Sequence, residues 1–428
     1  MKQMMEHFID QSKEEMISHI LELISYPSFT GDVEQNTKSV KYVLNLAEEM
    51  GFRTMATSDM SVGIVEMGEG DECVGILVHV DVVGVGDLEK WTDPPFHGVH
   101  RDGFIWGRGS LDDKGAVIIS LYAMKALFDL QVPLHKKVWL IIGTSEEDEW
   151  TDIATFKKEF PVPDYGFSPD GNFPIINEEK GYVDVTLLFD EPEIKKILDV
   201  RAGDSPNTVP SKAEITLEDG TQFTAIGESV HSSKPQKGKN AIILLSKKLQ
   251  EAGYAFQFVD FILTHLSDEG AIKDTSFTKE EGAISTFSPT IIGLEEGRVK
   301  LNINIRHKYG TRVEDISSVF SSMKEKYGYT FEVGDALEPI RVSTELPFLK
   351  LMDEVSKEYG VDGGFEMTAG TSYAKSMEQF VSWGPVLPQD PQTAHMEDER
   401  LRVSTMVLAT KMYARFLQRL LTEDTKKQ

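Results

Sequence analysis

Cysteine is nearly absent from this sequence, because Cys73 is the only one in 428 residues. An internal disulfide is therefore excluded, and Cys73 is interpreted as a small residue close to a strand. Long apolar runs are also missing, and the stretch from Met1 to Ile24 mixes charged residues with apolar residues at helical spacing. This pattern predicts an amphipathic helix and not a signal peptide or a membrane span. These absences predict a cytoplasmic protein without a membrane partner.

Basic residues are few relative to acidic ones. The chain has 44 lysines and arginines against 70 aspartates and glutamates, which gives a net charge of −26 at pH 7. This balance argues against nucleic acid or an anionic membrane as a partner, because both would repel the chain. The acidity suits the attraction of metal cations, although solubility alone also explains it. A chain of 428 residues exceeds what one core usually supports, so two domains are expected.

His79 ends an apolar run, Gly75 to Val78, at the point where a buried strand meets solvent. Buried parallel strands have such continuous runs, and ligands gather beyond their carboxyl ends. Asp81 lies two residues further on the same side of an extended chain, where a carboxylate can accept the second ring N–H of a metal-ligating histidine. The alternative is a strand-end histidine beside a solvated aspartate, and this pair alone leaves both interpretations open.

Four further polar sites follow along the chain. They are Asp112 with Asp113 in a glycine-rich turn, Glu146 with Glu147 after the apolar run Val138 to Ile142, Asp170 after a short strand-like segment, and His395 in a polar loop. The first three steps between successive sites have the size of βαβ units, which bring strand tips to one edge of a parallel sheet. For any one acidic pair a solvated turn is the alternative, because the chain is rich in acid.

Two imidazoles, two terminal carboxylates and one shared carboxylate are what a two-metal hydrolytic site needs. Each ion would take one histidine and one carboxylate, with an aspartate bridging the pair. Glu146 is then left free, and a carboxylate beside an activated water can take its proton and pass it to a leaving amine. These residue types therefore predict a metal-dependent hydrolase with Glu146 as general base and acid.

The successive motifs resemble those of the di-zinc aminoacylase, carboxypeptidase and carnosinase superfamily of metallopeptidases. The resemblance rests on His79-Val80-Asp81, Trp91 with Pro94-Pro95-Phe96, Gly107-Arg108-Gly109, Asp112-Asp113-Lys114-Gly115, Gly143-Thr144-Ser145-Glu146-Glu147 and Pro169-Asp170. It covers essentially the whole chain. Within the superfamily, the chain is most similar to the bacterial PepV-type Xaa-His dipeptidases.

The resemblance implies a role for each matched residue. Five residues are implied as metal ligands: His79 and Asp170 for one ion, Glu147 and His395 for the other, and Asp112 as the bridge. Asp81 then orients His79, Glu146 is the catalytic base, and a cis peptide bond follows Asp112. Two zinc ions are the expected cofactors, and manganese or cobalt are the alternatives for the same oxygen-rich site.

The long step from Asp170 to His395 requires an insertion. Between residues 182 and 340 the pattern changes to alternating strands, such as Tyr182 to Leu187 and Lys300 to Ile305. Alternation of apolar and polar residues indicates a sheet with one exposed face. We therefore expect a second domain within the first.

From Thr221 onward the expected order is strand, helix, strand, strand, helix, strand, which is ferredoxin-like, with a core at about 221–335. The expected fold class is α/β, with a central, mostly parallel sheet flanked by helices and an inserted α+β lid domain. The catalytic domain would be discontinuous, comprising residues 1–181 and 341–428, and the lid domain would comprise residues 182–340.

The resemblance adds three candidates in the insertion and one beyond it. His231 begins a His-x-Ser-x-Pro motif whose histidine stabilises an oxyanion, although a lone histidine at a strand-to-helix junction is more often structural. Arg306 resembles a lid arginine that binds the substrate carboxylate or backbone, and Asn207 resembles a lid asparagine near the same site. Lys375 stands where relatives have an arginine. Lysine keeps the positive charge but lacks the planar guanidinium, which binds a carboxylate through two N–H groups. Recognition of the substrate C-terminus is therefore expected to differ.

The expected function is hydrolysis of the peptide bond of a dipeptide or short peptide. A deacylase of N-acyl amino acids would share every metal residue and is the first alternative. A non-catalytic binding protein on the same scaffold is the second, although a site without chemistry has no reason to keep Glu146 beside five ligands. In much of the superfamily a dimer partner supplies lid groups, whereas PepV-type enzymes carry an enlarged lid. The length of the insertion therefore favours a monomer, with a homodimer as the alternative.

Overall fold

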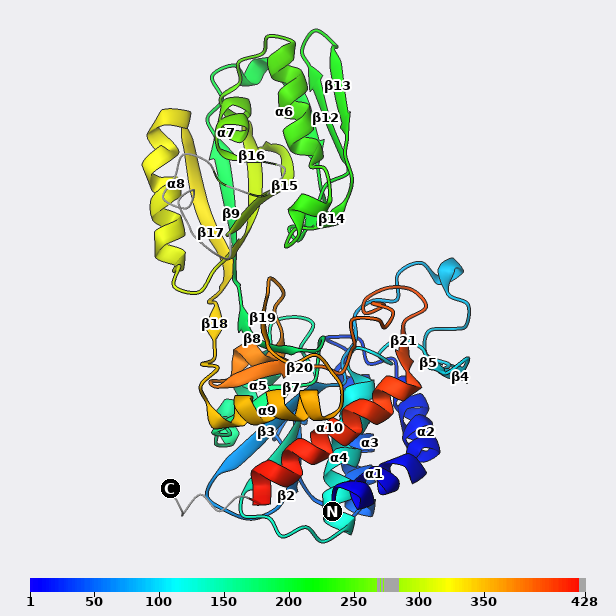
Figure 1. Cartoon of the computed structure of the whole chain (residues 1–428). Helices are drawn as coiled ribbons and strands as arrows, with labels where there is room; N and C mark the ends of the chain where they lie inside the picture. Colours follow the sequence, from blue (N-terminus) through cyan, green and yellow to red (C-terminus); the bar gives the residue numbers. More distant parts are fainter. Residues whose placement is uncertain (268–269, 271, 273–284, 423–428) are drawn as a thin grey trace. The chain divides into compact units, whose positions relative to one another are not determined.

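The structure, a computed structural model, describes residues 1–267, 270, 272 and 285–422. The chain forms two compact units. The first comprises Met1–Asn177, Val342–Glu366 and Ser372–Gln428, and the second comprises Glu178–Arg341 and Met367–Thr371. Figure 1 follows the chain through both by colour.

The first unit combines helices with a large sheet. Its helices are α1 (Lys2–Gln11), α2 (Lys13–Ile24), α3 (Val33–Glu49), α4 (Lys114–Asp129), α5 (Thr151–Glu159), α9 (Pro347–Glu358) and α10 (Val403–Thr422), with the 3-10 helices η1 (Leu88–Lys90) and η5 (Tyr373–Ser376). Its strands are β1 (Arg53–Ala56), β2 (Gly63–Met67), β3 (Cys73–His79), β4 (Val99–Arg101), β5 (Phe104–Trp106), β6 (Lys137–Gly143), β7 (Tyr165–Ser168), β20 (Phe380–Trp383) and β21 (Arg400–Arg402). Strands β8 (Ile175–Glu179) and β19 (Phe365–Thr368) begin in it.

The N-terminal stretch differs in one detail from the prediction of a single helix. Two helices, α1 and α2, meet at Ser12. The hydroxyl of Ser12 donates to the carbonyl oxygen of Phe8, at 3.0 Å. Serine side chains that bond to a nearby carbonyl compete with the continuing helix, and here the helix divides.

The main sheet has the strand order β1-β2-β6-β3-β7-β20-β8. Its four central strands run parallel, because β3 pairs in parallel with β6 and β7, and β7 pairs in parallel with β20. The outer pairs are antiparallel. The predicted α/β class with a central, mostly parallel sheet flanked by helices is therefore confirmed.

Both faces of this sheet are buried, which explains the continuous apolar run of β3. Ile76 and Val78 belong to a core shared with residues of α4 and α10, which pack together on one side of the sheet (Figure 1). Leu77 belongs to the opposite core, with Phe156 of α5 and Tyr373 of η5. Successive side chains of a strand point to opposite faces, so a strand covered on both sides is apolar throughout.

The second unit is built on a seven-stranded sheet with the order β13-β12-β10-β15-β16-β9-β17. Its strands are β9 (Gly181–Phe189), β10 (Ile197–Ala202), β11 (Thr208–Val209), β12 (Lys212–Leu217), β13 (Gln222–Ile226), β14 (Val230–His231), β15 (Thr286–Glu295), β16 (Arg298–His307), β17 (Tyr329–Leu337) and β18 (Ile340–Arg341). Its helices are η2 (Ile194–Lys196), η3 (Pro235–Lys237), α6 (Ala241–Glu251), α7 (Gln257–His265) and α8 (Val313–Tyr327). Apolar residues of the sheet form one core with α6, α7 and α8.

The ferredoxin-like order that was expected to begin at Thr221 needs a correction. Strand β13, which follows Thr221, lies at the edge of the sheet, in the order β13-β12-β10-β15. Each of these three neighbouring pairs is antiparallel, so β13 and β15 run in opposite directions. Strands β9 and β15 both pair with β16, and both pairs are antiparallel, so β9 is parallel to β15. A split βαβ unit needs parallel strands on either side of its helix. Strand β9 therefore opens the βαββαβ order, and β10 to β14 are inserted before α6. The linear pattern could not reveal this, because strand order is set by pairing.

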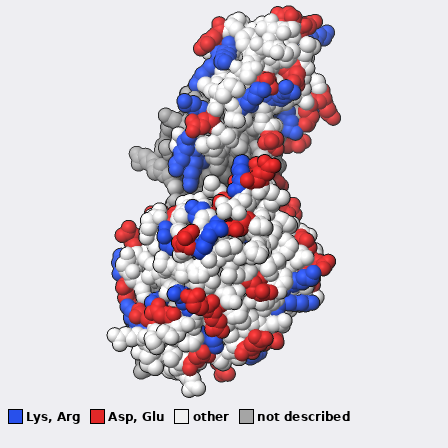
Figure 2. Space-filling view, turned by 90° about the vertical axis from the view of Figure 1, so that its right-hand side faces the viewer, with Lys and Arg blue, Asp and Glu red and all other residues white. Residues whose placement is uncertain are grey.

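The described residues include no membrane-spanning helix, and one face of the molecule shows no separation of charge (Figure 2). Within residues 1–267, 270, 272 and 285–422, no helix has the length and apolarity needed to span a membrane. Figure 2 shows one face of the molecule, on which acidic and basic side chains are interspersed over each unit. The excess of acidic residues is thus spread over this face.

Candidate active site

The five predicted metal ligands all lie in the first unit, at strand tips or in adjacent loops. His79 ends β3, Asp112 precedes α4, Glu147 follows β6, Asp170 follows β7, and His395 lies in the loop before β21. The registers of β3, β6 and β7 are parallel, and His79 pairs with Gly143 at the end of β6. Parallel strands deliver their carboxyl ends to one edge, which brings these side chains together.

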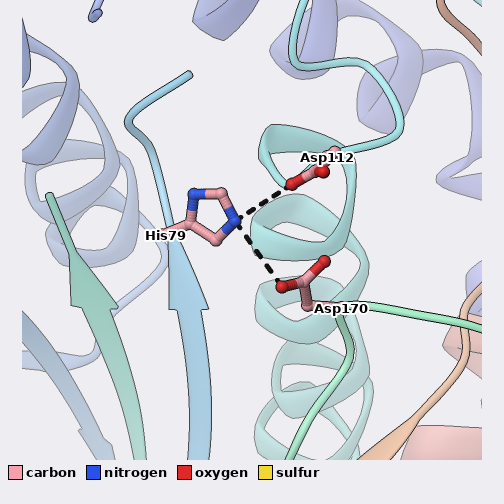
Figure 3. A group of neighbouring side chains, drawn as sticks. All are labelled: His79, Asp112 and Asp170. Atoms are coloured by element: carbon pink, nitrogen blue, oxygen red, sulfur yellow. Dashed lines mark ion pairs between the residues drawn. The ribbon is translucent and has the colours of Figure 1, made fainter. Parts of the chain in front are cut away.

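His79 and two carboxylates form the first group, shown in Figure 3. The Nε2 atom of His79 lies 3.1 Å from Oδ1 of Asp112 and 3.8 Å from Oδ2 of Asp170. The imidazole is fully buried. Figure 3 shows both carboxylates directed at the same ring nitrogen.

His395 completes a second group on the other side of Asp112. Its Nε2 atom lies 3.0 Å from Oδ2 of Asp112 and 2.9 Å from Oε1 of Glu147. The two oxygens of Asp112 therefore face two different imidazoles. His395 has a φ of 62°, a left-handed conformation that residues other than glycine rarely adopt. The loop thus holds this residue in an unusual conformation at the point where its side chain meets the carboxylates.

The donor atoms fit divalent cations. Within each of the groups His79–Asp112–Asp170 and Asp112–Glu147–His395, the ligating atoms lie within 4.8 Å of one another. Among the described residues, Nε2 of His79 and Oδ1 of Asp112 are buried without a hydrogen-bond partner. A buried polar atom without a partner is costly, and a cation would satisfy both atoms. Imidazole and carboxylate ligands without thiolates suit zinc, manganese or cobalt.

Protonation in this cluster is shifted strongly by burial and by charge. Hydrogen bonds to Asp112 and Glu147 raise the pKa of His395 to about 11. Burial and the charge of Asp112 raise the pKa of Glu147 to about 7. Burial opposes ionisation of Asp112, but the interactions with the two neighbouring imidazoles outweigh it and lower the pKa of Asp112. Protons and divalent cations compete for such ligands, so metal binding here would release protons.

Glu146 lies at the same edge. One of its carboxylate oxygens lies within 4.8 Å of the ligating atoms of His79 and Glu147. Burial raises the pKa of Glu146 well above its usual range, against the opposing charge of His79. A carboxylate with a raised pKa can hold a proton near neutral pH and release it again.

Asp81 links the tips of β3 and β6. Its backbone oxygen lies 3.0 Å and its Oδ1 atom 3.3 Å from Nδ1 of His79. The backbone N–H groups of Glu146 and Glu147 donate to the two carboxylate oxygens of Asp81, at 3.2 and 3.3 Å, and the hydroxyl of Thr30 also donates to Oδ2. Asp81 is fully buried. It therefore positions the histidine and the backbone of the two glutamates together.

A buried pair that the sequence reasoning missed supports the turn before α4. Glu399 accepts hydrogen bonds from the backbone N–H groups of Leu111, at 2.9 Å, and Asp112, at 3.1 Å. Its other oxygen accepts from Nη1 of Arg108, at 2.6 Å. Both side chains are buried. In the sequence Glu399 is one of several acids after His395, and only its burial distinguishes it. The peptide bond between Asp112 and Asp113 is cis, as the resemblance implied.

Tyr373 and Asp152 form a second support that the sequence did not reveal. The hydroxyl of Tyr373 donates to Oδ2 of Asp152, which also accepts from the backbone N–H of Thr144, at 2.6 Å. The ring of Tyr373 meets the ring of His79 edge to face, with centroids 6.0 Å apart. The segment that carries Lys375 is thereby attached near the ends of β3 and β6, and Lys375 itself is half-buried.

A pocket of about 270 Å³ opens beside the ligands in the first unit. Its lining includes Asp112, Asp170, Asn172 and Gln392. A concave site with a few convergent polar groups is the usual setting for a small substrate.

The three other candidates, His231, Arg306 and Asn207, lie in the second unit. His231 lies on β14 and pairs with Thr208 of β11, and the backbone oxygen of Asn207 accepts from the N–H of Ser232, at 2.8 Å. Arg306 is buried, with its guanidinium 4.7 Å from the ring centre of Tyr182. The structure therefore groups the five ligands with Glu146 in one unit and these three residues in the other.

The hydrogen bonds of His231 determine which ring nitrogen carries the proton in its neutral form. The backbone N–H of Ser233 donates to Nδ1 of His231, at 3.1 Å, and the hydroxyl of Ser233 lies 2.7 Å from the same atom. A backbone N–H can only donate, so Nδ1 must accept. The neutral ring then carries its proton on Nε2, so this atom acts as a hydrogen-bond donor.

Comparison with known proteins connects most of the chain to one family. A model of peptidase family M20/M25/M40 matches residues 75–419. The protein named "Putative dipeptidase YtjP" of Bacillus subtilis (strain 168) is 32% identical over 424 residues, which cover 89% of this chain and 90% of that protein.

Two solved structures share the fold. Human carnosine dipeptidase 1 has a TM-score of 0.66 at 15% identity, covering 99% of this chain and 100% of that chain. The aminoacylhistidine dipeptidase of Vibrio alginolyticus has a TM-score of 0.66 at 13% identity, covering 95% of this chain and 96% of that chain. The sequence matches extend over most of the chain, and on their strength the protein belongs to peptidase family M20/M25/M40, a family of peptide hydrolases.

Proposed function

We propose that this protein is a dipeptidase that depends on two divalent metal ions and hydrolyses the peptide bond of dipeptides and short peptides. The observation that carries the proposal is the position of Asp112, whose two carboxylate oxygens lie 3.1 and 3.0 Å from the imidazoles of His79 and His395. Asp170 lies beside His79, and Glu147 lies beside His395. Two-metal hydrolases typically place one shared carboxylate between two sets of ligands, and each set here is a histidine with a carboxylate.

In the proposed mechanism, His79 and Asp170 would hold one ion and Glu147 and His395 the other, with Asp112 shared between the two sets. Two ions held there would supply Lewis acidity, which can polarise a carbonyl group and lower the pKa of water. Zinc is the ion we expect, with manganese and cobalt as alternatives.

The proton transfers are assigned to Glu146. Its carboxylate takes the proton of the attacking water and passes it to the nitrogen of the leaving amine. Its raised pKa suits a group that must accept a proton and then release it near neutral pH. Asp81 keeps the backbone of Glu146 fixed through its hydrogen bond of 3.2 Å.

The second unit is proposed to supply the groups that recognise the substrate. His231, with its proton on Nε2, donates to the oxygen that becomes negatively charged in the tetrahedral intermediate. Arg306 binds a substrate carboxylate or carbonyl group, and its Nε atom is buried without a hydrogen-bond partner among the described residues. Asn207, and Lys375 of the first unit, are proposed as further substrate contacts.

A preference for Xaa-His dipeptides is part of the proposal, on the strength of the sequence resemblance. The names of the relatives support dipeptides as the substrate class. We also propose a cytoplasmic location, which rests on the single cysteine, and a monomer, which rests on the length of the inserted unit.

The test combines metal content with hydrolysis. Metal bound to the purified protein is measured by elemental mass spectrometry, and hydrolysis is measured on Xaa-His dipeptides, other dipeptides and N-acetyl amino acids. The same assays follow chelation and re-addition of zinc, manganese or cobalt. We expect two ions per chain and dipeptide cleavage that chelation abolishes and metal restores.

Each other outcome has a defined meaning. Two ions with cleavage of N-acetyl amino acids alone would establish a deacylase on the same site. A protein that binds no metal under any of these conditions would contradict the two-metal proposal.

A further inference from the structure

The face of the second sheet opposite α6, α7 and α8 carries a row of buried polar residues. Asn304 of β16 is fully buried. Its Oδ1 atom accepts from the hydroxyl of Ser232, at 2.8 Å, and its Nδ2 atom donates to Oδ1 of Asp184, at 3.1 Å. The other oxygen of Asp184 accepts from the hydroxyl of Tyr182. These partners fix the orientation of the Asn304 amide, because only one orientation lets it accept from one neighbour and donate to the other.

The Asn304 amide binds Ser232, which is the residue that follows His231. Ser232 is fully buried, and its backbone N–H donates to the carbonyl oxygen of Asn207, at 2.8 Å. His231 itself lies on a ribbon of two strands, β11 and β14, with only two residues in each. Such a short ribbon is not stable by itself. The hydrogen bond between Ser232 and Asn304 attaches it to the seven-stranded sheet.

The same network reaches Arg306. Arg306 lies two residues after Asn304 on β16, and residues two apart on a strand share a face. Its guanidinium lies 4.7 Å from the ring centre of Tyr182, whose hydroxyl donates to the Asp184 carboxylate that Asn304 also contacts. The polar row therefore connects the two groups of this unit to which we assign contact with the reacting substrate.

We infer that Asn304 is a positioning residue: through Ser232 it holds the imidazole of His231 in the place from which Nε2–H donates to the oxyanion. The inference rests on the proposed function for its catalytic consequence. Because His231 acts in the transition state, loss of the anchor lowers kcat and leaves KM nearly unchanged.

Strand β16 also offers a matched control. Asn302 is the same residue type, two positions before Asn304, and is also buried. Its side chain accepts from the hydroxyl of Thr290, at 2.7 Å, and donates to the hydroxyl of Thr186, at 3.3 Å. Replacement of Asn302 removes equivalent hydrogen bonds from the same sheet face without removing the bond to Ser232.

The kinetic test is a double-mutant cycle. Asn304→Ala and Asn302→Ala are made in the wild type and in the His231→Ala variant. We expect Asn304→Ala to lower kcat about ten- to a hundredfold in the wild type and less than about twofold in His231→Ala. Asn302→Ala should change kcat less than about twofold in the wild type. Ser232→Ala deletes the same hydrogen bond from its other end and should reproduce the effect of Asn304→Ala.

A second measurement does not depend on activity. In protein with 13C-labelled histidine, the Cε1–H signal of His231 is identified by its loss in His231→Ala. We expect this signal to shift or broaden in Asn304→Ala and Ser232→Ala and to stay in place in Asn302→Ala. An unchanged His231 signal in Asn304→Ala, or an equal loss of kcat in the presence and absence of His231, would overturn the inference. If the wild type hydrolyses no peptide, the proposed function fails, and the histidine signal still decides the positioning role.

Discussion

Glu399 holds the backbone of Asp112 through a hydrogen bond of 3.1 Å from the Asp112 N–H to its Oε1 atom. The same oxygen accepts from Leu111, and the other oxygen pairs with the buried guanidinium of Arg108. Glu399 thus fixes the backbone of Asp112, whose carboxylate lies between the two imidazoles. In the hydrogen bonds described, Glu399 contacts neither imidazole. Replacement of a residue that orients a metal ligand in this way typically lowers metal affinity about 10- to 100-fold.

Glu399→Ala is expected to lower the free energy of unfolding by about 3–5 kcal/mol, because it leaves Arg108 buried without its partner. The apparent metal affinity should fall about 10- to 100-fold. Urea unfolding and metal titration measure the two effects. Glu397→Gln is the matched control, because Glu397 lies half-buried in the same loop, where it accepts from the backbone N–H of Asp87, at 3.2 Å, and lies 3.9 Å from Nζ of Lys90. Equal effects of the two substitutions would show that Glu399 has no special role.

Glu146→Ala is expected to leave two metal ions per chain and to lower kcat about 10²- to 10⁴-fold, the usual contribution of a general base. Metal content is measured on the same sample as turnover. Asp148→Ala provides the control, since Asp148 is exposed two residues away and should retain wild-type kcat. A Glu146→Ala protein with more than about a tenth of wild-type kcat would rule out Glu146 as the base.

His231→Ala is expected to lower kcat about 10²- to 10³-fold with little change in KM, because the lost hydrogen bond strengthens only as the oxyanion develops. Metal content should be unchanged, since His231 is not among the proposed ligands. Gln236→Ala, an exposed change in the nearby helix η3, should have wild-type kinetics. A rise in KM at constant kcat would instead indicate that His231 serves ground-state binding.

Alkylation of Cys73 is expected to be slow and to accelerate with pH. Burial disfavours the charged thiolate and raises the pKa of Cys73 to about 12. The reactive thiolate is then a small fraction at neutral pH, and the rate with iodoacetamide should rise about tenfold per pH unit between about pH 7 and pH 10. The single cysteine makes the mass change unambiguous. A rate that levels off near about pH 9, as for a free cysteine, would contradict the raised pKa.

The ligand cluster shows what a sequence pattern can predict. His79, Glu147 and Asp170 each follow an apolar run, and their spacing suggests successive parallel strands. Parallel strands must deliver their ends to one sheet edge, so the linear order leads directly to a spatial grouping. The structure brings these residues together with Asp112 and His395, and the roles assigned to them stay predictions for the experiments above.

Other features depend on pairing between distant segments and had no signal in the sequence. The strand that opens the βαββαβ order is β9 and not β13, because antiparallel pairing places β13 at the sheet edge. Glu399 and Tyr373 support the site through burial against Arg108 and Asp152. An acid or a tyrosine in a loop looks the same in the sequence whether it is buried or solvated.

The sequence by itself determined the fold class and the family and predicted the set of candidate metal ligands, because apolar runs, turn residues and their spacing are local properties of the chain. The tertiary structure decided which side chains hold these candidate ligands in place. Asn304 and Asn302 are the same residue two positions apart on one strand, and only the packing of Ser232 against Asn304 distinguishes them. A hydrogen bond forms only where donor and acceptor atoms lie within about 3 Å of each other. Packing between distant segments of the chain decides which buried polar atoms come that close.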